Sequence, residues 1–230
     1  MKILAFIPAR GGSKGVKDKN LKLIAGKPLI KYAVECAQQC SHPLTIVVNS
    51  DSDAILSGVG DDKSVVLQKR DACLAEDDTP VTDVLFDALQ RINETFDLIV
   101  LMQPTSPIRS GQDLDSIIAM FIDDRVDGVV SVVPMDDMHP ARMYNLSEDA
   151  FLIPYEQENE VKRRQKLIPV YYRNGCFYAV RADVFLEQRS LMPENKKAYV
   201  MSVNHLANID SPRDLIVTEA LLREWREGRL

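Results

Sequence analysis

The sequence has 230 residues, enough for one sizeable core or at most two modest domains. Its 28 Lys and Arg residues are outnumbered by 34 Asp and Glu residues, and the net charge of −6 argues against a general nucleic-acid binder. No apolar run approaches the roughly 18 residues of a membrane span, and the start lacks a secretory pattern, so we expect a cytoplasmic protein with neither membrane nor nucleic-acid partners.

Short apolar runs rich in Val and Ile alternate along the chain with helical patterns. Strands are expected at residues 3–7, 44–48, 64–67, 98–102, 128–133, 176–180 and 198–203. These runs are apolar on both faces, which is typical of strands buried between two helical layers. Helices are expected at residues 28–40 and 114–121 and after two Pro-containing starts, Thr79-Pro80 and Ser211-Pro212. The alternation predicts an α/β fold, a mostly parallel sheet with helices on both faces, in a single domain over residues 1–230.

One long segment, residues 134–169, interrupts this alternation and has a highly charged centre. Segments of this length inside compact domains tend to be functional arms, lids or oligomerisation elements. We expect an inserted arm used for dimerisation. A solvated surface insertion is the alternative interpretation.

The basic side chains are concentrated at the start of the chain. Residues 1–31 contain eight basic and one acidic side chain, a net charge of +7, which leaves −13 for the other residues. Four of the ten glycines fall in the same stretch. An acidic protein with a basic, glycine-rich start is expected to bind an anion there.

The glycine-rich loop, residues 9–20, follows the first predicted strand. In an open parallel sheet ligands bind beyond the carboxyl ends of the strands, and this loop leaves that edge. Glycines let backbone N–H groups converge on an anion, and Arg10, Lys14 and Lys19 supply positive charge. The loop therefore predicts phosphate binding, although it matches neither the P-loop nor the dinucleotide fingerprint. A surface turn with solvated lysines is the alternative.

The run from Ile7 to Gly15, with Lys19-Asn20-Leu21, resembles the opening motif of the acylneuraminate cytidylyltransferases, the CMP-sialic acid synthetases. Four further blocks follow in the family's order and spacing: residues 70–75, 101–109, 174–178 and 209–215. The resemblance covers essentially the whole chain. It implies a Rossmann-like domain of the nucleotide-diphospho-sugar transferase type, a homodimer, and transfer of CMP from CTP to a nine-carbon 2-keto sugar acid with release of pyrophosphate.

In this reaction a sugar hydroxyl attacks the α-phosphate of CTP, so catalysis consists mainly of positioning and charge neutralisation. The resemblance implies that Lys19, Arg10 and Asp210 are catalytic, with Lys19 at the α-phosphate, and that Arg70 reads the cytosine edge. A surface arginine paired with Asp71 is the alternative for Arg70. The nucleotide-binding residues implied in full are Ala9, Arg10, Gly11, Gly12, Ser13, Asn20 and Arg70.

The sugar side of the site is implied by the same resemblance. The expected substrate-binding residues are Gln103, Thr105, Ser106, Thr82, Arg164 and Tyr178. Thr82 has the alternative of an ordinary threonine in the first turn of a helix. Arg164, and with it Arg142, would reach the sugar site of a second subunit from the arm, whereas a solvated charged face is the more economical explanation of each alone.

The family carries an Asp-x-Asp metal motif, and this chain has Asn208-Ile209-Asp210 in its place. Magnesium usually takes one or two carboxylates plus substrate phosphates, so we expect it at Asp210 with Asn208 as a neutral second ligand. This departure leaves the number of metal ions open. It also keeps open an inactive nucleotide-binding scaffold. A separate alternative is an enzyme for the eight-carbon 3-deoxy-manno-octulosonic acid. The identity of the nine-carbon acid stays open among N-acetylneuraminic, legionaminic, pseudaminic and deaminated acids.

Overall fold

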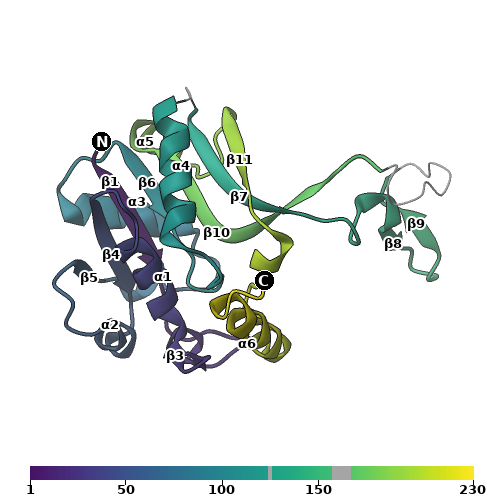
Figure 1. The fold of residues 1–230 in the computed structure, drawn as a ribbon, viewed down its shortest axis with the longest axis horizontal. Helices are drawn as coiled ribbons and strands as arrows, with labels where there is room; N and C mark the ends of the chain where they lie inside the picture. The colour runs from purple at the N-terminus through teal and green to yellow at the C-terminus, as the bar shows by residue number, and fades with distance from the viewer. Residues whose placement is uncertain (124–125, 157–166) are drawn as a thin grey trace.

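The computed structural model describes residues 1–123, 126–156 and 167–230, and its centre is a seven-stranded sheet (Figure 1). The strand order is β11-β7-β10-β6-β1-β4-β5. The bounds are β1 Ile3–Pro8, β4 Leu44–Ser50, β5 Val65–Lys69, β6 Leu98–Leu101, β7 Gly128–Pro134, β10 Tyr171–Arg181 and β11 Lys196–Val200. Neighbouring strands are parallel except β10, which is antiparallel to both β6 and β7. The prediction of a mostly parallel sheet is confirmed.

Helices cover both faces of the sheet, as predicted. They are α1 Leu29–Gln38, α2 Asp53–Val59, α3 Val81–Ile92, α4 Gly111–Asp123, α5 Ala182–Gln188 and α6 Pro212–Arg226. The sequence pattern missed α2 and α5, because seven residues are too few to show a helical period. The start of α3 was predicted one residue early: Pro80 occupies the N-cap position and the helix begins at Val81.

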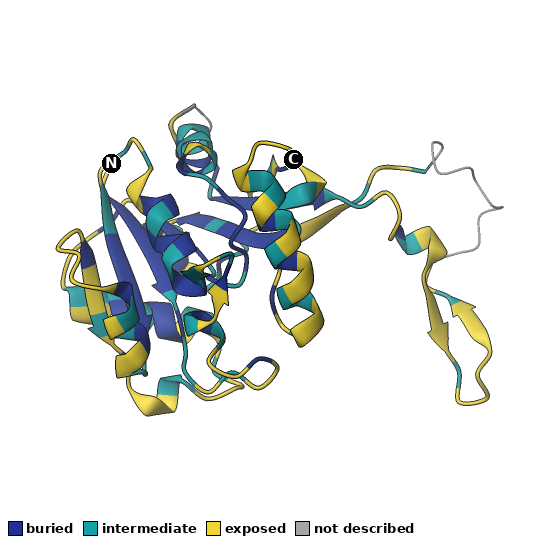
Figure 2. Ribbon diagram, turned by 60° about the horizontal axis from the view of Figure 1, so that its bottom comes forward, coloured by how far each residue is buried: buried dark blue, intermediate teal, exposed yellow. Residues whose placement is uncertain are grey.

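The side chains of β1 alternate between two buried layers. Figure 2 shows the central strands of the sheet coloured as buried. Ile3, Ala5 and Ile7 pack into the core cluster that contains residues of α1, α2 and α4. Leu4 and Phe6 point the other way, into the cluster that contains residues of α3 and α5. Because the period of a strand is two, this single run of apolar residues joins both helical layers.

A third, smaller cluster attaches the C-terminal helix to the start of the chain. Leu222 of α6 belongs to the same cluster as Ile24 and Leu29. Ile24 is part of the hairpin of β2 Leu23–Ile24 and β3 Lys27–Pro28, and Leu29 follows it. The Asp214 carboxylate accepts hydrogen bonds from the Ser211 N–H at 2.7 Å and the Ser211 hydroxyl at 2.9 Å, which closes a capping box at the start of α6. Residues 207–211 are thereby held beside the glycine-rich loop.

The long segment forms an arm that projects from the sheet (Figure 1). It leaves β7, passes the 3-10 helix Pro140–Arg142 and ends in a hairpin of β8 Tyr144–Leu146 and β9 Leu152–Pro154. β10 begins five residues before the predicted strand and leads back to the body. Arg164 lies outside the described residues. None of the described helices has the length and apolar character to cross a bilayer.

Candidate active site

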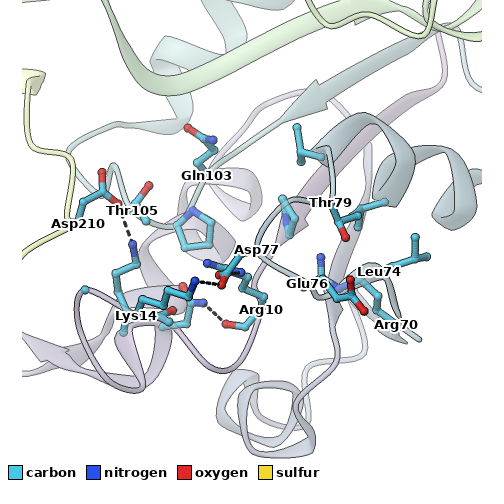
Figure 3. A pocket seen from close by; sticks show the side chains of 18 residues that line it. Arg10, Lys14, Arg70, Leu74, Glu76, Asp77, Thr79, Gln103, Thr105 and Asp210 are labelled. Carbon is cyan, nitrogen blue, oxygen red and sulfur yellow. Dashed lines mark hydrogen bonds and ion pairs between the residues drawn. The ribbon is translucent and has the colours of Figure 1, made fainter. Parts of the chain in front are cut away.

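Four parallel strands end at one edge of the sheet, and the loops that follow them meet there. A cavity of about 330 Å³ lies at this edge, within the size range of small-molecule sites (Figure 3). It is lined by residues of the glycine-rich loop, of the segment after β5, of the loop after β6 and of the residues before α6. Its polar lining comprises Arg10, Ser13, Lys14, Lys19, Asn20, Arg70, Glu76, Asp77, Thr79, Gln103, Thr105 and Asp210.

The glycine-rich loop is pressed against the backbone of Asp210. A Cβ atom at Gly15 would lie 1.9 Å from the Asp210 carbonyl oxygen, so no side chain fits at this position. At the far end of the loop, the buried Asn20 donates from Nδ2 to the Arg10 carbonyl oxygen at 3.0 Å. The loop is therefore closed on itself and fixed next to the carboxylate of Asp210.

Lys19 and Asp210, 191 residues apart in the chain, form an ion pair at the cavity wall. Lys19 Nζ donates to the Ile209 carbonyl oxygen at 2.7 Å and to Asp210 Oδ1 at 3.0 Å. Asn208 donates from its side-chain nitrogen to the other carboxylate oxygen of Asp210. The Lys19 side chain is 14% exposed and that of Asp210 66%, so the ammonium is oriented by the wall while the carboxylate faces the open cavity.

Asp77 binds two further cations of the loop, Arg10 and Lys14, a contact that the sequence pattern missed. Arg10 Nη1 lies 2.5 Å from Asp77 Oδ1, and Lys14 pairs with the second oxygen (Figure 3). Hydrogen bonds from Lys14 and Arg10 lower the pKa of the Asp77 carboxyl. The sequence signal here was a run of three acids, Glu76-Asp77-Asp78, a few residues beyond Arg70.

Arg70 lies beneath the same cavity with its side chain 5% exposed. Its Nη2 donates to Asp51 Oδ1 at 3.4 Å, while its Nε has no hydrogen-bond partner among the described residues. Burial lowers the pKa of the Arg70 guanidinium and the Asp51 charge partly offsets this. The alternative of a surface arginine paired with Asp71 is wrong, because Asp71 pairs with Arg91.

Some of the other predicted site residues line the cavity and some do not. Gln103 and Thr105 line it, as does Ser13. Ser106 is buried, and its hydroxyl donates to the Asn174 carbonyl oxygen at 2.9 Å, so it ties the loop after β6 to β10. The predicted residues that do not line the cavity are Ala9, Gly11, Gly12, Thr82, Ser106, Tyr178 and Asn208.

The donor set at the cavity suits one kind of cation. No group of three or more His, Cys, Asp or Glu side chains within the described ranges could hold a metal by itself. The Asp210 carboxylate is about two-thirds exposed beside Lys19, whereas the Asp77 carboxylate is engaged by Arg10 and Lys14. One carboxylate together with the oxygens of a bound phosphate is an arrangement that magnesium uses.

Comparison with known proteins gives concordant matches. A family model described as cytidylyltransferase matches residues 4–209. The chain is 33% identical to a CMP-N,N'-diacetyllegionaminic acid synthase of Legionella pneumophila over 99% of both chains. It is 30% identical to an N-acylneuraminate cytidylyltransferase of Streptococcus agalactiae, covering 94% of this chain and 52% of the relative, so it spans about half of that protein. The fold is shared with a CMP:2-keto-3-deoxy-manno-octonic acid synthetase complexed with CTP, with a TM-score of 0.71, 19% identity and coverage of 98% and 100%.

Proposed function

The chain belongs to the cytidylyltransferase family, and from that membership we propose that it transfers CMP from CTP to the anomeric hydroxyl of a nine-carbon 2-keto sugar acid, releasing pyrophosphate. It is an enzyme of the nucleotidyltransferase class. The observation that carries the proposal is the single cavity wall on which Arg10, Lys14, Lys19 and Asp210 meet. Such a concentration of cations, with the exposed Asp210 carboxylate next to them, suits a triphosphate and its metal.

The phosphate chemistry falls to the glycine-rich loop. Attack of the sugar hydroxyl on the α-phosphate places extra negative charge on the phosphate oxygens before pyrophosphate leaves. Lys19 is held by the Ile209 carbonyl oxygen and Asp210, so its ammonium is already oriented when that charge develops. Arg10 and Lys14 come earlier in the loop, and we assign to them the binding of the phosphates that leave.

Base recognition is assigned to Arg70. Its buried guanidinium keeps Nε without a partner among the described residues and borders the cavity. Cytosine presents two adjacent acceptors, O2 and N3, which match the donors of an arginine. The sugar side is assigned to Gln103 and Thr105, because an amide and a hydroxyl can both donate and accept toward sugar hydroxyls or a carboxylate.

Magnesium is assigned to Asp210 together with the phosphates of the substrate. When bound, the ion would neutralise phosphate charge and orient the leaving pyrophosphate. Asn208 directs its NH₂ group toward Asp210 and does not line the cavity, so its contribution here is to orient the carboxylate.

The arm supports a homodimer as part of the proposal. Leu146, Phe151 and Leu152 are 68%, 71% and 64% exposed, although apolar side chains of this size gain free energy when buried. A two-stranded hairpin is only marginally stable alone, and a second copy of the chain would cover both hairpins by symmetry. The solution mass, measured by light scattering, is expected to be twice 25.9 kDa.

The activity is tested by pyrophosphate release from CTP with a panel of sugar acids. The panel begins with N,N'-diacetyllegionaminic acid, since a relative of that name matches over 99% of the chain, and includes N-acetylneuraminic, pseudaminic and deaminated acids. We expect release only when CTP and one of these acids are both present. Equal release with a hexose 1-phosphate and another nucleotide would contradict the proposal.

Two alternatives are separated in the same experiment. A preference for 3-deoxy-manno-octulosonic acid would identify the eight-carbon substrate, a possibility kept by the shared fold. An inactive scaffold, which the asparagine at position 208 keeps open, would be stabilised against heat by CTP with magnesium and yet release no pyrophosphate with any acid.

A further inference from the structure

Asp51 lies between the two halves of the nucleotide site without lining the cavity itself. It follows β4, whose carboxyl end is flanked by those of β1 and β5. β1 leads into the glycine-rich loop, and β5 leads directly to Arg70. The strand order thus brings the residue after β4 next to both elements.

One carboxylate oxygen of Asp51 accepts from both sides. The Gly11 N–H donates to Asp51 Oδ1 at 2.9 Å, and Arg70 Nη2 donates to the same atom at 3.4 Å. The second oxygen also lies against the loop, where a Cβ at Gly11 would be only 3.2 Å from Asp51 Oδ2. The loop backbone and the guanidinium are therefore held relative to each other by a single side chain.

Arg70 depends on this contact for its placement. Asp51 is the one side chain to which the described residues show a hydrogen bond from the Arg70 guanidinium. Arg10 is close enough to repel it, and burial also disfavours its charged form. Without the carboxylate, the guanidinium would lose both its orientation and the charge that offsets Arg10.

We propose that Asp51 is a positioning residue that fixes Arg70 relative to the glycine-rich loop and thereby sets the preference for CTP over UTP. This inference rests on the proposed function, in which Arg70 meets the base. Cytosine N3 is a hydrogen-bond acceptor, whereas uracil carries a hydrogen at N3. A guanidinium held in a fixed orientation can therefore donate to cytosine N3, but its N–H faces another N–H in uracil. A guanidinium free to turn away discriminates less.

The test compares Asp51→Asn with Asp53→Asn. Asparagine keeps an acceptor oxygen for the Gly11 N–H but removes the charge beside Arg70. Asp53 provides the matched control, because it lies two residues away and pairs with the exposed Lys69. For Asp51→Asn we expect the ratio of kcat/KM for CTP to that for UTP to fall about tenfold, the loss of one charge-assisted contact, while the control keeps the ratio.

Inhibition by pyrophosphate measures phosphate binding at the glycine-rich loop separately from recognition of the base at Arg70. Asp51→Asn is expected to keep the wild-type inhibition constant within about twofold, whereas Asp51→Ala, which removes both acceptors, should weaken inhibition and lower the base preference together. Thermal unfolding of each variant shows whether the chain is folded at the assay temperature.

A double-mutant cycle with Arg70→Met decides whether Asp51 acts through Arg70. We expect Asp51→Asn to cause little further loss of CTP preference once Arg70 is replaced. Independent, additive losses would overturn the inference, and so would an Asp51→Asn variant that keeps the wild-type preference. Failure of the wild-type protein to use CTP would instead overturn the proposed function, and the role of Asp51 with it.

Discussion

The cavity and the arm are both built from segments that follow strand ends, and they differ in how their side chains are satisfied. At the cavity the charged groups find partners within the chain: Lys19 with Asp210, and Arg10 and Lys14 with Asp77. On the arm the β8–β9 hairpin leaves large apolar side chains exposed. Figure 2 shows this hairpin in the colour of exposed residues, well apart from the buried strands of the sheet. The cavity's cations are thus paired within a single chain, whereas the hairpin has apolar surface left to bury.

The difference follows from where each region lies in the fold. Parallel strands bring their carboxyl ends to one edge, so loops distant in sequence supply opposite charges to one place. Among its described residues the arm forms the two short strands β8 and β9, and Figure 1 shows none of the described α-helices packed on them. We therefore expect substitutions at the cavity to change catalysis within one chain and substitutions on the arm to change association between chains.

The largest effect on catalysis is expected from replacing Lys19, the residue assigned to the reacting α-phosphate. Lys19→Ala should lower kcat by roughly 10²- to 10³-fold and weaken CTP binding far less, because the ammonium stabilises charge that develops at the α-phosphate. Steady-state kinetics and CTP titration calorimetry measure the two separately. Lys22→Ala, an exposed lysine that does not line the cavity, provides the control. Comparable losses in kcat and affinity would make Lys19 a plain binding group.

Asp210→Asn tests whether the cavity needs its carboxylate for metal. We expect activity at saturating CTP to fall roughly 10²-fold and the magnesium concentration for half-maximal activity to rise, since an amide is a weaker ligand than a carboxylate. A magnesium titration of the initial rate measures both. The control is Asp183→Asn, which should behave as wild type. Asp183 is an exposed carboxylate on α5 that pairs with Arg181. Unchanged magnesium dependence in Asp210→Asn would remove this residue from the metal site.

Phe151→Asp tests the arm side of the comparison. If the hairpin is buried between subunits, a charge at this position should weaken association by about tenfold or more, the loss of one large apolar contact. Sedimentation at several protein concentrations measures the dissociation constant, and thermal unfolding checks the body. Glu148→Gln on the same hairpin is the control. A wild-type protein that is monomeric at all concentrations would show that the arm does not pair with a second copy.

Asp77→Asn is expected to have the smallest effect on the kinetics and, unlike the other cavity substitutions, to favour CTP binding. The lowered pKa keeps Asp77 ionised at neutral pH, so a triphosphate has to compete with it for Arg10 and Lys14. Removing the charge should lower the KM for CTP by about two- to fivefold, in keeping with a partly exposed ion pair. The same kinetic assay measures it, with Asp78→Asn alongside. A raised KM would mean that Asp77 organises the loop for CTP.

Local pattern in the sequence carried much of the fold and part of the site. Short runs that are apolar on both faces located the strands of the central sheet, and the resemblance of the blocks around Arg10, Arg70, Gln103 and Asp210 to those of a known family implied that these side chains meet at one site. These features are encoded locally, because burial on both faces and ligand loops after parallel strands leave a signature in adjacent residues.

Pairings between distant residues left no such signature. The sequence analysis did not single out Asp51 or Asp77, because their contacts with Gly11, Arg70 and Arg10 arise only when β1, β4 and β5 lie side by side. Ser106 looked like a binding residue, but folding buries it against β10. Charge and hydropathy along the chain thus indicated a phosphate-binding protein with a parallel sheet. Which acid meets which cation depended on strand order, because hydrogen bonds and ion pairs act over a few ångströms of space, whatever the separation along the chain.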